Sequence, residues 1–291
     1  MGMVQSRGEK IFQVLNVILL LLIAGATLYP FWYVFIVSIS GSDAIMAGKT
    51  MLLPRDVNLD SYKEVLHYPD IWNTYANTLF YTIVGTFVNM ALTVFAAYPL
   101  ARKKFVFKKF FLLMVTITMF FQGGIIPTYL VVNKLGLTDN RWGLIIPTAI
   151  MTWFLIILRS FFMTIPDSME ESAKIDGASD LSVLFRIILP LSKAGLAIIA
   201  LYYAVFHWND YFNALMYINK KELYPLTITL THIVLQNDTL RQAQSAGDIR
   251  PGLSVAIRYA TIVVAVLPIL LVYPYIQKYF VKGVMLGSIK G

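Results

Sequence analysis

The sequence predicts an all-α membrane protein with six transmembrane helices. Hydrophobic residues make up 58% of its 291 residues and charged residues only 14%, whereas soluble domains carry about 25% charged residues. Long apolar runs recur along the chain, and each is long enough for a helical span, which needs about 20 apolar residues. None of these runs has the short, alternating pattern that is typical of a β-barrel strand.

Six segments are expected to cross the membrane. They run from 14 to 39, 78 to 101, 110 to 132, 143 to 163, 194 to 218 and 253 to 280. Arg7 and Lys10 precede the first run, and Ala24 to Ala26 resembles the cleavage site of a signal peptide. The run continues well beyond that point, too far for a signal peptide, so an uncleaved first span is predicted.

The charges predict the orientation of the spans. Five cations lie between the second and third spans: Arg102, Lys103, Lys104, Lys108 and Lys109. Because cytoplasmic loops are enriched in Lys and Arg, this loop is expected in the cytoplasm, together with both termini and the 164–193 loop. Segments 40–70, 133–142 and 219–252 then face outward. The predicted location is the cytoplasmic (inner) membrane, multi-pass, in contact with lipid. The net charge of +8 could suggest nucleic acid as a partner, but the clustering of cations in one short loop argues against it.

The 164–193 loop is predicted to be a helix, a glycine turn and a second helix. Ser168 and Glu171 have the spacing of a capping box, which starts a helix, and Gly177 can adopt the left-handed conformation that ends one. The second helix should present one apolar stripe, formed by Leu181, Leu184, Phe185 and Ile188. A purely structural alternative is an amphipathic hairpin that rests in the lipid interface.

The spacing within this loop is more specific than its helices. The chain reproduces the signature E-A-A, three residues, G, nine residues, I-x-L-P through Glu171, Ala173, Gly177, Ile187, Leu189 and Pro190, with Ser172 replacing one alanine. This loop resembles the coupling loop of ABC-importer permeases, and most of all the maltose-type, carbohydrate-importing branch. The position of the loop between the fourth and fifth spans, the run from Trp208 to Phe212 and the ending from Tyr279 to Gly283 agree with that branch.

The resemblance covers nearly the whole chain and implies the type I ABC importer permease architecture, with a cytoplasmic coupling-helix loop. It implies three parts: 1–70 with the first span and an outer loop, a five-span permease domain over 71–280, and a cytoplasmic tail over 281–291. It also implies a set of ATPase-coupling residues, namely Glu171, Ser172, Ala173, Asp176, Gly177, Ile187, Leu189 and Pro190. In that set Glu171 would be the charged contact to the ATPase, Ala173 would allow close approach, and Gly177 would set the turn.

The same resemblance implies the partners. They are a second, homologous permease, two ATPase subunits and an extracytoplasmic solute-binding protein, whose cleft the 219–252 loop is expected to enter. This chain has no G-x-x-x-x-G-K-[ST] phosphate loop, and the segment from Gly41 to Lys49 has the wrong spacing for one. No cofactor is therefore expected on this chain, and ATP and Mg are expected on the partner ATPase.

Polar residues inside the spans form a candidate substrate pathway. The residues are Gln122, Trp208, Asn209, Asp210, Tyr211 and Asn213. Amide and hydroxyl groups bond to sugar hydroxyls, and aromatic faces cover the apolar faces of sugar rings. An interfacial aromatic belt with interhelical hydrogen bonds would use the same residue types. Asp210 and Arg258 are expected at similar depths, where they would form an outer gate or a structural staple between two helices.

The predicted function is the permease subunit of an ATP-driven, binding-protein-dependent importer for a sugar or oligosaccharide. A first alternative is an ABC-importer permease for a non-sugar solute. A second is an ion-coupled carrier, which would need ionisable groups near the bilayer midplane and paired broken helices. An enzyme is not expected, because the three histidines, His67, His207 and His232, lack metal-ligand spacing and no nucleophile–base pair is evident.

Overall fold

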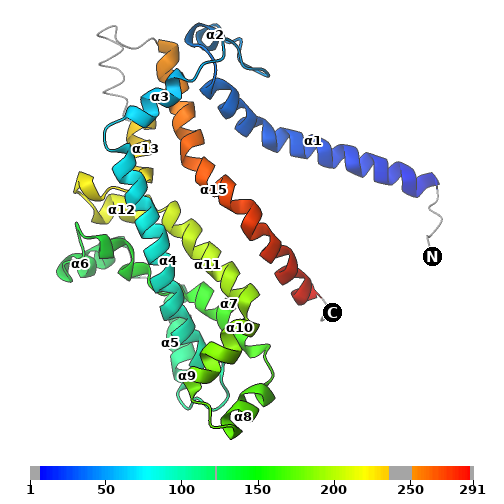
Figure 1. Cartoon of the computed structure of the whole chain (residues 1–291), viewed down its shortest axis with the longest axis vertical. Helices are drawn as coiled ribbons and strands as arrows, with labels where there is room; N and C mark the ends of the chain where they lie inside the picture. Colours follow the sequence, from blue (N-terminus) through cyan, green and yellow to red (C-terminus); the bar gives the residue numbers. More distant parts are fainter. Residues whose placement is uncertain (1–6, 122, 236–250, 289–291) are drawn as a thin grey trace. The chain divides into compact units, whose positions relative to one another are not determined.

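A computed structural model of the chain describes residues 7–121, 123–235 and 251–288. The described residues form helices and no strand, which confirms the all-α class (Figure 1). The α-helices are α1 (Arg7–Ser38), α2 (Ser42–Met46), α3 (Asp60–His67), α4 (Ile71–Ala101), α5 (Lys108–Phe120), α6 (Ile125–Lys134), α7 (Thr152–Met163), α8 (Asp167–Ile175), α9 (Asp180–Val183), α10 (Leu189–Leu191), α11 (Lys193–Trp208), α12 (Phe212–Tyr217), α13 (Leu226–Leu235) and α15 (Pro251–Ser288). The shorter turns are the 3₁₀ helices η1 (Arg141–Leu144), η2 (Ile146–Thr148) and η4 (Lys221–Leu223) and the π-helical segment η3 (Leu184–Ile188).

Three helices are long and apolar enough to cross a membrane by themselves: α1, α4 and the part of α15 from Gly252 to Leu271. Among the described residues, three bent pairs of helices pass the same test of length and composition when each pair is taken together. In these, α5 meets α6 at 119°, the η1–η2 segment meets α7 at 55°, and the segment Asp180–Leu191 meets α11 at 85°. Counting each bent pair as one span gives the six predicted spans. Prolines accompany two of these bends, since Pro127 lies in the first turn of α6 and Pro147 lies in η2, and proline interrupts a helix.

The predicted fifth span, 194–218, is wrong in its outer part. Helix α11 ends at Trp208 and α12 begins only at Phe212. The Asn209 side chain donates to the Val205 carbonyl at 2.8 Å, and Asn and Asp side chains commonly compete with helical backbone bonds in this way. The predicted depth of Asp210 in the membrane assumed one continuous helix from 194 to 218. Because the helix is interrupted at 209–211, that depth no longer follows.

The chain divides into two compact units. Unit 1 comprises the described residues within 1–69 and 230–267, and unit 2 those within 70–229 and 268–291. In unit 1 the segment after α1 turns back, and the Gly41 amide donates to the Arg55 carbonyl at 2.9 Å. The Asn58 amide donates to the Ile39 carbonyl at 3.0 Å, which closes the loop between α1 and α3.

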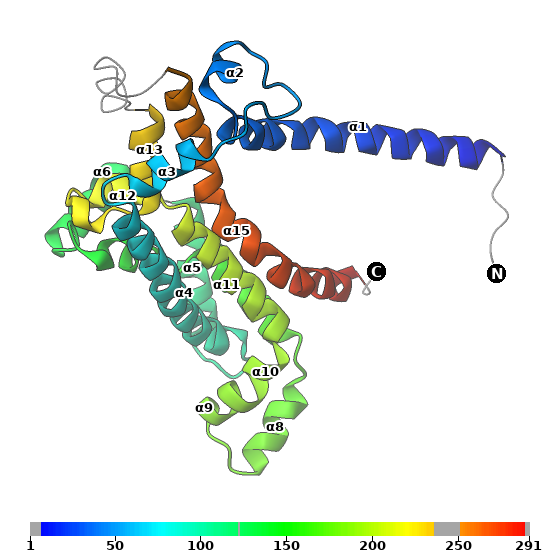
Figure 2. The same ribbon diagram turned by 45° about the horizontal axis from the view of Figure 1, so that its top comes forward.

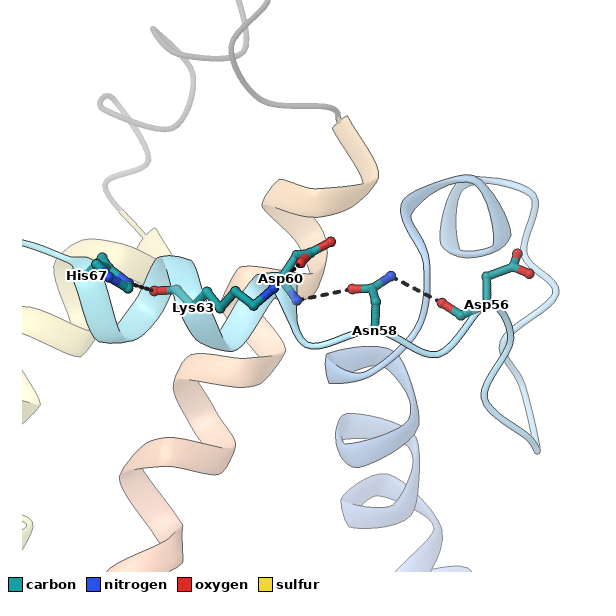
Figure 3. Close-up of polar contacts among 5 residues, drawn as sticks. All are labelled: Asp56, Asn58, Asp60, Lys63 and His67. Carbon is teal, nitrogen blue, oxygen red and sulfur yellow. Dashed lines mark hydrogen bonds and ion pairs between the residues drawn. The ribbon is translucent and has the colours of Figure 1, made fainter.

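Figure 3 shows how the same loop leads into α3. The Asn58 side chain accepts from the Asp60 amide at 3.2 Å and donates to the Asp56 carbonyl at 3.1 Å. Within α3, Lys63 pairs with Asp60 at 3.1 Å, and the His67 ring contacts the Lys63 carbonyl at 2.7 Å. These short-range bonds start the helix where the loop ends.

Unit 2 is built around α4, which lies beside α7 and α11 (Figures 1 and 2). Its inner core contains Tyr98 and Ala97 of α4, Phe162 of α7, and Ile199 and Tyr203 of α11. Helices α8 and α9 lie at the end of unit 2 where α4 terminates, and α6 and α12 lie toward the end where α4 begins. The α4 helix thus runs the length of unit 2 and links both of its ends.

Close approach between α4 and α11 depends on Gly85. A Cβ atom at this position would lie 2.5 Å from Nε2 of the buried His207 ring. Small residues let transmembrane helices approach closely where lipid supplies no hydrophobic drive for association. Here the space that a side chain would need is filled by an imidazole.

Gly85→Leu should destabilise the α4–α11 interface by about 1–3 kcal/mol, the usual cost of overpacking a filled core. The measurement is the thermal unfolding midpoint of the purified protein in detergent. Gly25→Leu is the matched control, because a Cβ atom at Gly25 in α1 meets nothing within 4 Å. Equal midpoints for the two variants would contradict this account of the interface.

Candidate functional site

The C-terminal end of α8 has the glycine turn that the sequence predicts. Gly177 has a φ of +80°, a conformation that glycine adopts at little cost. Its amide donates to the Lys174 carbonyl at 3.1 Å, and the Ala178 amide donates to the Ala173 carbonyl at 2.9 Å. These two bonds form a Schellman motif. Ala173 and Ala178 both pack against the inner core of unit 2, so the turn fixes α8 to the membrane-embedded helices.

The predicted capping box at the start of α8 is wrong. The helix begins at Asp167, directly after Pro166, and no side chain caps it. The Pro166 carbonyl accepts from the Met169 amide at 3.2 Å, so the first turn closes before Ser168 can act as a cap. Asp167 and Glu170 lie in this first turn, where negative charge is favoured by the helix dipole.

In the second helix of the loop, the four apolar residues predicted to form one stripe do not share one buried face. Ser179, and no predicted residue, caps α9 by accepting from the Ser182 amide at 3.3 Å. Leu184 and Ile188 are fully buried as expected, but the side chains of Leu181 and Phe185 are 59% and 53% exposed. The reason is the π-helical turn η3, which changes the spacing of residues on each face of the helix.

The remaining predicted coupling residues surround this turn. Ile187 and Leu189 pack against the inner core, and Pro190 lies in the first turn of α10. Asp176 follows the last residue of α8 and is exposed, as is Ser172. In this loop the short helix α8 is therefore largely exposed, whereas the residues that follow it, including Ile187 and Leu189, pack against the core of unit 2.

A chain of ion pairs connects α8 to the end of α4. Arg102, the residue after α4, places Nη1 3.0 Å from Oε2 of Glu170. Lys174 contacts Glu170 and Asp180 at 2.8 Å each, and these two carboxylates raise the pKa of the Lys174 ammonium. The Arg102 guanidinium also lies over the Tyr98 ring, 5.0 Å from its centroid. Both side chains of the Arg102–Glu170 pair are almost completely shielded from solvent.

Two further pairs lie on the exposed side of α8. Lys103 Nζ lies 2.7 Å from Oδ2 of Asp167, and Lys104 Nζ lies 4.0 Å from Oε1 of Glu171. The hydrogen bond between Lys103 and Asp167 raises the pKa of the lysine and lowers that of the carboxyl. Glu171 itself is 60% exposed. Among the three paired acids of α8 itself, Asp167, Glu170 and Glu171, it is thus the most accessible, and it remains available to a partner.

The break in the fourth span is closed by side chains from two other helices. The Asn89 amide of α4 donates to the Thr148 carbonyl at 3.0 Å, and the Met151 amide donates to the Tyr203 hydroxyl of α11 at 3.0 Å. The same hydroxyl contacts Thr93 at 2.7 Å. Since lipid cannot satisfy free backbone groups, a broken helix is tolerated only with such partners.

The predicted pathway residues lie at the break between α11 and α12. Asp210 is buried and accepts from the backbone amide of Asn213 at 3.2 Å and from its side-chain amide at 2.9 and 3.1 Å. The Asp210 carbonyl accepts from Thr227 at 3.1 Å. Asp210 therefore caps α12. Trp208 is half-buried, and Asn209 and Tyr211 are exposed.

Two predictions about the substrate pathway, the role of Gln122 and the pairing of Asp210 with Arg258, are not tested by the contacts described above. Gln122 lies outside the described residues. Arg258 belongs to unit 1 and Asp210 to unit 2, so their pairing as a gate or staple stays a prediction.

The N-terminal end of α4 binds the loop that follows α12. The Asn77 side chain donates to the carbonyls of Glu222 and Tyr224 at 2.7 and 3.1 Å. The Tyr81 hydroxyl donates to the Leu223 carbonyl at 2.9 Å. The 222–224 segment, which belongs to the predicted outer loop, is therefore fixed to α4 through its backbone.

Sequence reasoning missed five residues that organise the site: Asn77, Asn89, Arg102, Glu170 and Tyr203. A signal existed for two of them. Glu170 and Lys174 have the i, i+4 spacing of a helical ion pair, and a polar residue in mid-span, such as Asn89, indicates a specific partner. Nothing in the sequence indicates that Arg102 is buried, since the neighbouring cations suggest an exposed patch.

The fold is that of a membrane protein with several helical spans and a protruding helical loop at α8 (Figure 1). The chain belongs to the family of binding-protein-dependent transport system inner membrane components, which matches residues 69–286. The resemblance inferred from the loop motif is thereby confirmed. The chain is a transporter permease and not itself a catalytic subunit.

Relatives of known name support this assignment. The chain is 41% identical to the polygalacturonan/rhamnogalacturonan transport system permease protein YtcP of Bacillus subtilis, over 97% of this chain and 99% of that protein. It is 40% identical to protein LplC of the same organism, over 98% and 97% of the two chains. The fold matches a bacterial ABC transporter involved in the import of the acidic polysaccharide alginate, with a TM-score of 0.90, 35% identity, and coverage of 96% of this chain and 100% of that one.

Tyr203→Phe should destabilise the protein by about 1–3 kcal/mol, because the Met151 amide at the break would lose its buried acceptor. The measurement is again the thermal unfolding midpoint in detergent. Tyr129→Phe is the control, since its ring stacks on Tyr217 with 6.3 Å between the ring centroids and this contact survives the loss of the hydroxyl. An unchanged midpoint for Tyr203→Phe would show that the break does not need this hydroxyl.

Proposed function

We propose that this chain is one of two permease subunits of an ATP-driven importer for oligosaccharides, with acidic oligosaccharides as its cargo. The observation that carries the proposal is the near full-length similarity to YtcP, whose name specifies polygalacturonan and rhamnogalacturonan. The structural relative imports alginate, which is named as an acidic polysaccharide. Polygalacturonan is a polymer of galacturonic acid, so both cargoes carry carboxylates.

The importer would contain a second, homologous permease, two ATPase subunits with ATP and Mg, and an extracytoplasmic binding protein. Both termini and the α8 loop would be cytoplasmic, because the cations at 102–109 flank the same membrane face. The 219–252 loop would meet the binding protein. Family membership supports an ATPase and a binding protein as partners, and it disfavours the ion-coupled carrier considered from the sequence.

Helix α8 is the proposed contact to the ATPase. Its free surface carries Met169 and Ile175, which are 44% and 86% exposed, next to the exposed Glu171. Apolar side chains beside an accessible carboxylate suit a partner groove that contains a cation. ATP-driven closure of the two ATPase subunits would move the α8 loops of both permeases and open the pathway outward. Asn209, Asp210, Tyr211 and Asn213 are proposed to lie along that pathway.

Gly177→Leu should reduce uptake per ATP hydrolysed, because a side chain at a φ of +80° costs about 1–2 kcal/mol and would distort the end of α8. The measurement is uptake and ATP hydrolysis in the same membrane vesicles. Gly48→Leu is the matched control: Gly48 also has a positive φ, +65°, and nothing lies within 4 Å of its added Cβ. Wild-type coupling in Gly177→Leu would refute the role of the turn.

The cargo can be tested with the complete complex in vesicles that enclose ATP. Oligogalacturonides should be taken up in an ATP-dependent manner, and maltooligosaccharides of the same length should not. Uptake of only the neutral oligosaccharides would refute the acidic cargo. Uptake of only sn-glycerol-3-phosphate, which names more distant relatives that are 28% identical, would instead favour a non-sugar importer.

A further inference from the structure

The Arg102–Glu170 pair is the one strongly buried ion pair among the salt bridges of the described residues. The two side chains are 10% and 12% exposed, whereas every other pair has a partner that is at least 36% exposed. Glu170 comes from α8 and Arg102 directly follows α4. One buried contact between opposite charges therefore joins the protruding helix to the longest helix of unit 2.

Stability alone does not explain a pair of this kind. Removing two charges from water is expensive, and apolar residues of similar size often serve a buried position equally well or better. In addition, only Nη1 of Arg102 contacts Glu170, and Nε and Nη2 are buried without a hydrogen-bond partner in the described part of the chain. A guanidinium presents a fork of donors, so the pair can shift from one nitrogen to another without breaking when α8 moves.

Helix α4, at the Arg102 side of the ion pair, is held firmly by its neighbours. Helix α4 is continuous over 31 residues, which corresponds to roughly 45 Å. Its last turn is fastened to α7 by Arg159, whose Nε donates to the Leu100 carbonyl at 2.9 Å. A force that reaches Arg102 therefore acts on a rigid helix that packs against both α7 and α11.

We propose that the Arg102–Glu170 pair transmits the displacement of α8 to α4, and that Arg102 and Glu170 are positioning residues for coupling. The proposal rests on the proposed function, in which a partner ATPase moves α8. The apolar contacts of Ala173 and Ala178 resist approach of α8 but resist its withdrawal only weakly. A buried ion pair resists withdrawal, because separation would leave the buried Arg102 guanidinium without its carboxylate, while Glu170 would keep only Lys174 as a partner.

The test uses the complete importer in vesicles and measures uptake per ATP hydrolysed. Arg102→Met and Glu170→Gln should each lower this ratio roughly three- to thirtyfold, the range of coupling changes seen for residues that connect two sites. The exchanged double variant Arg102→Glu with Glu170→Arg should recover part of the loss. Lys103→Met is the matched control and should keep the wild-type ratio, since the Lys103–Asp167 pair is exposed and such pairs contribute little.

A second measurement does not depend on the cargo. The chain contains no cysteine, so spin labels can be attached to Ser168→Cys on α8 and Leu92→Cys on α4, both of which are exposed. On addition of ATP the distance between the labels should stay constant in the otherwise wild-type complex, and should change in Arg102→Met.

Two results would overturn the proposal. One is a wild-type ratio and a constant label distance in Arg102→Met. The other is failure of the complex to assemble in Glu170→Gln as well as in Arg102→Met, which would make the pair a structural staple. If the wild-type complex imports no oligosaccharide, the proposed function fails, and the label distances still decide whether the pair links α8 to α4.

Discussion

The structure of unit 2 depends on one constraint, which is that backbone groups freed inside a membrane must find partners within the protein. The fourth span is broken between η2 and α7, and its free carbonyl and amide are bound by Asn89 and Tyr203. These partners come from α4 and α11, so the break ties three helices together. The same constraint at the end of α11 is met by Asp210, which caps α12.

Helix α4 connects the regions with proposed functions. Its N-terminal end binds the 222–224 segment through Asn77 and Tyr81. Its middle supports the broken span, and its C-terminal end leads to Arg102 and the ion pair with Glu170. A single unbroken helix with polar contacts at both ends is suited to carry motion along unit 2, because its backbone hydrogen bonds run over 31 residues.

The sequence predicted the class of the fold and the protruding loop well, and local geometry less well. Spans follow from hydropathy because burial in lipid depends on composition, and the Gly177 turn follows because few residues tolerate a positive φ. The predicted capping box is wrong because the residue before α8 is Pro166, and not Ser168, and its side chain cannot cap the helix. The apolar stripe failed at Leu181 and Phe185 because a π-helical turn is not visible in a periodicity.

By itself the sequence determined that this is a six-span permease with a motif-bearing loop, since apolar length and motif spacing are local properties of the chain. Only the tertiary structure decided which charges are paired. Arg102, Lys103 and Lys104 are alike in the sequence, yet Arg102 is buried against Glu170 while the two lysines remain exposed. The physical reason is that burial and ion pairing depend on where α8 folds back against α4, and neighbouring residues in the sequence do not encode that contact.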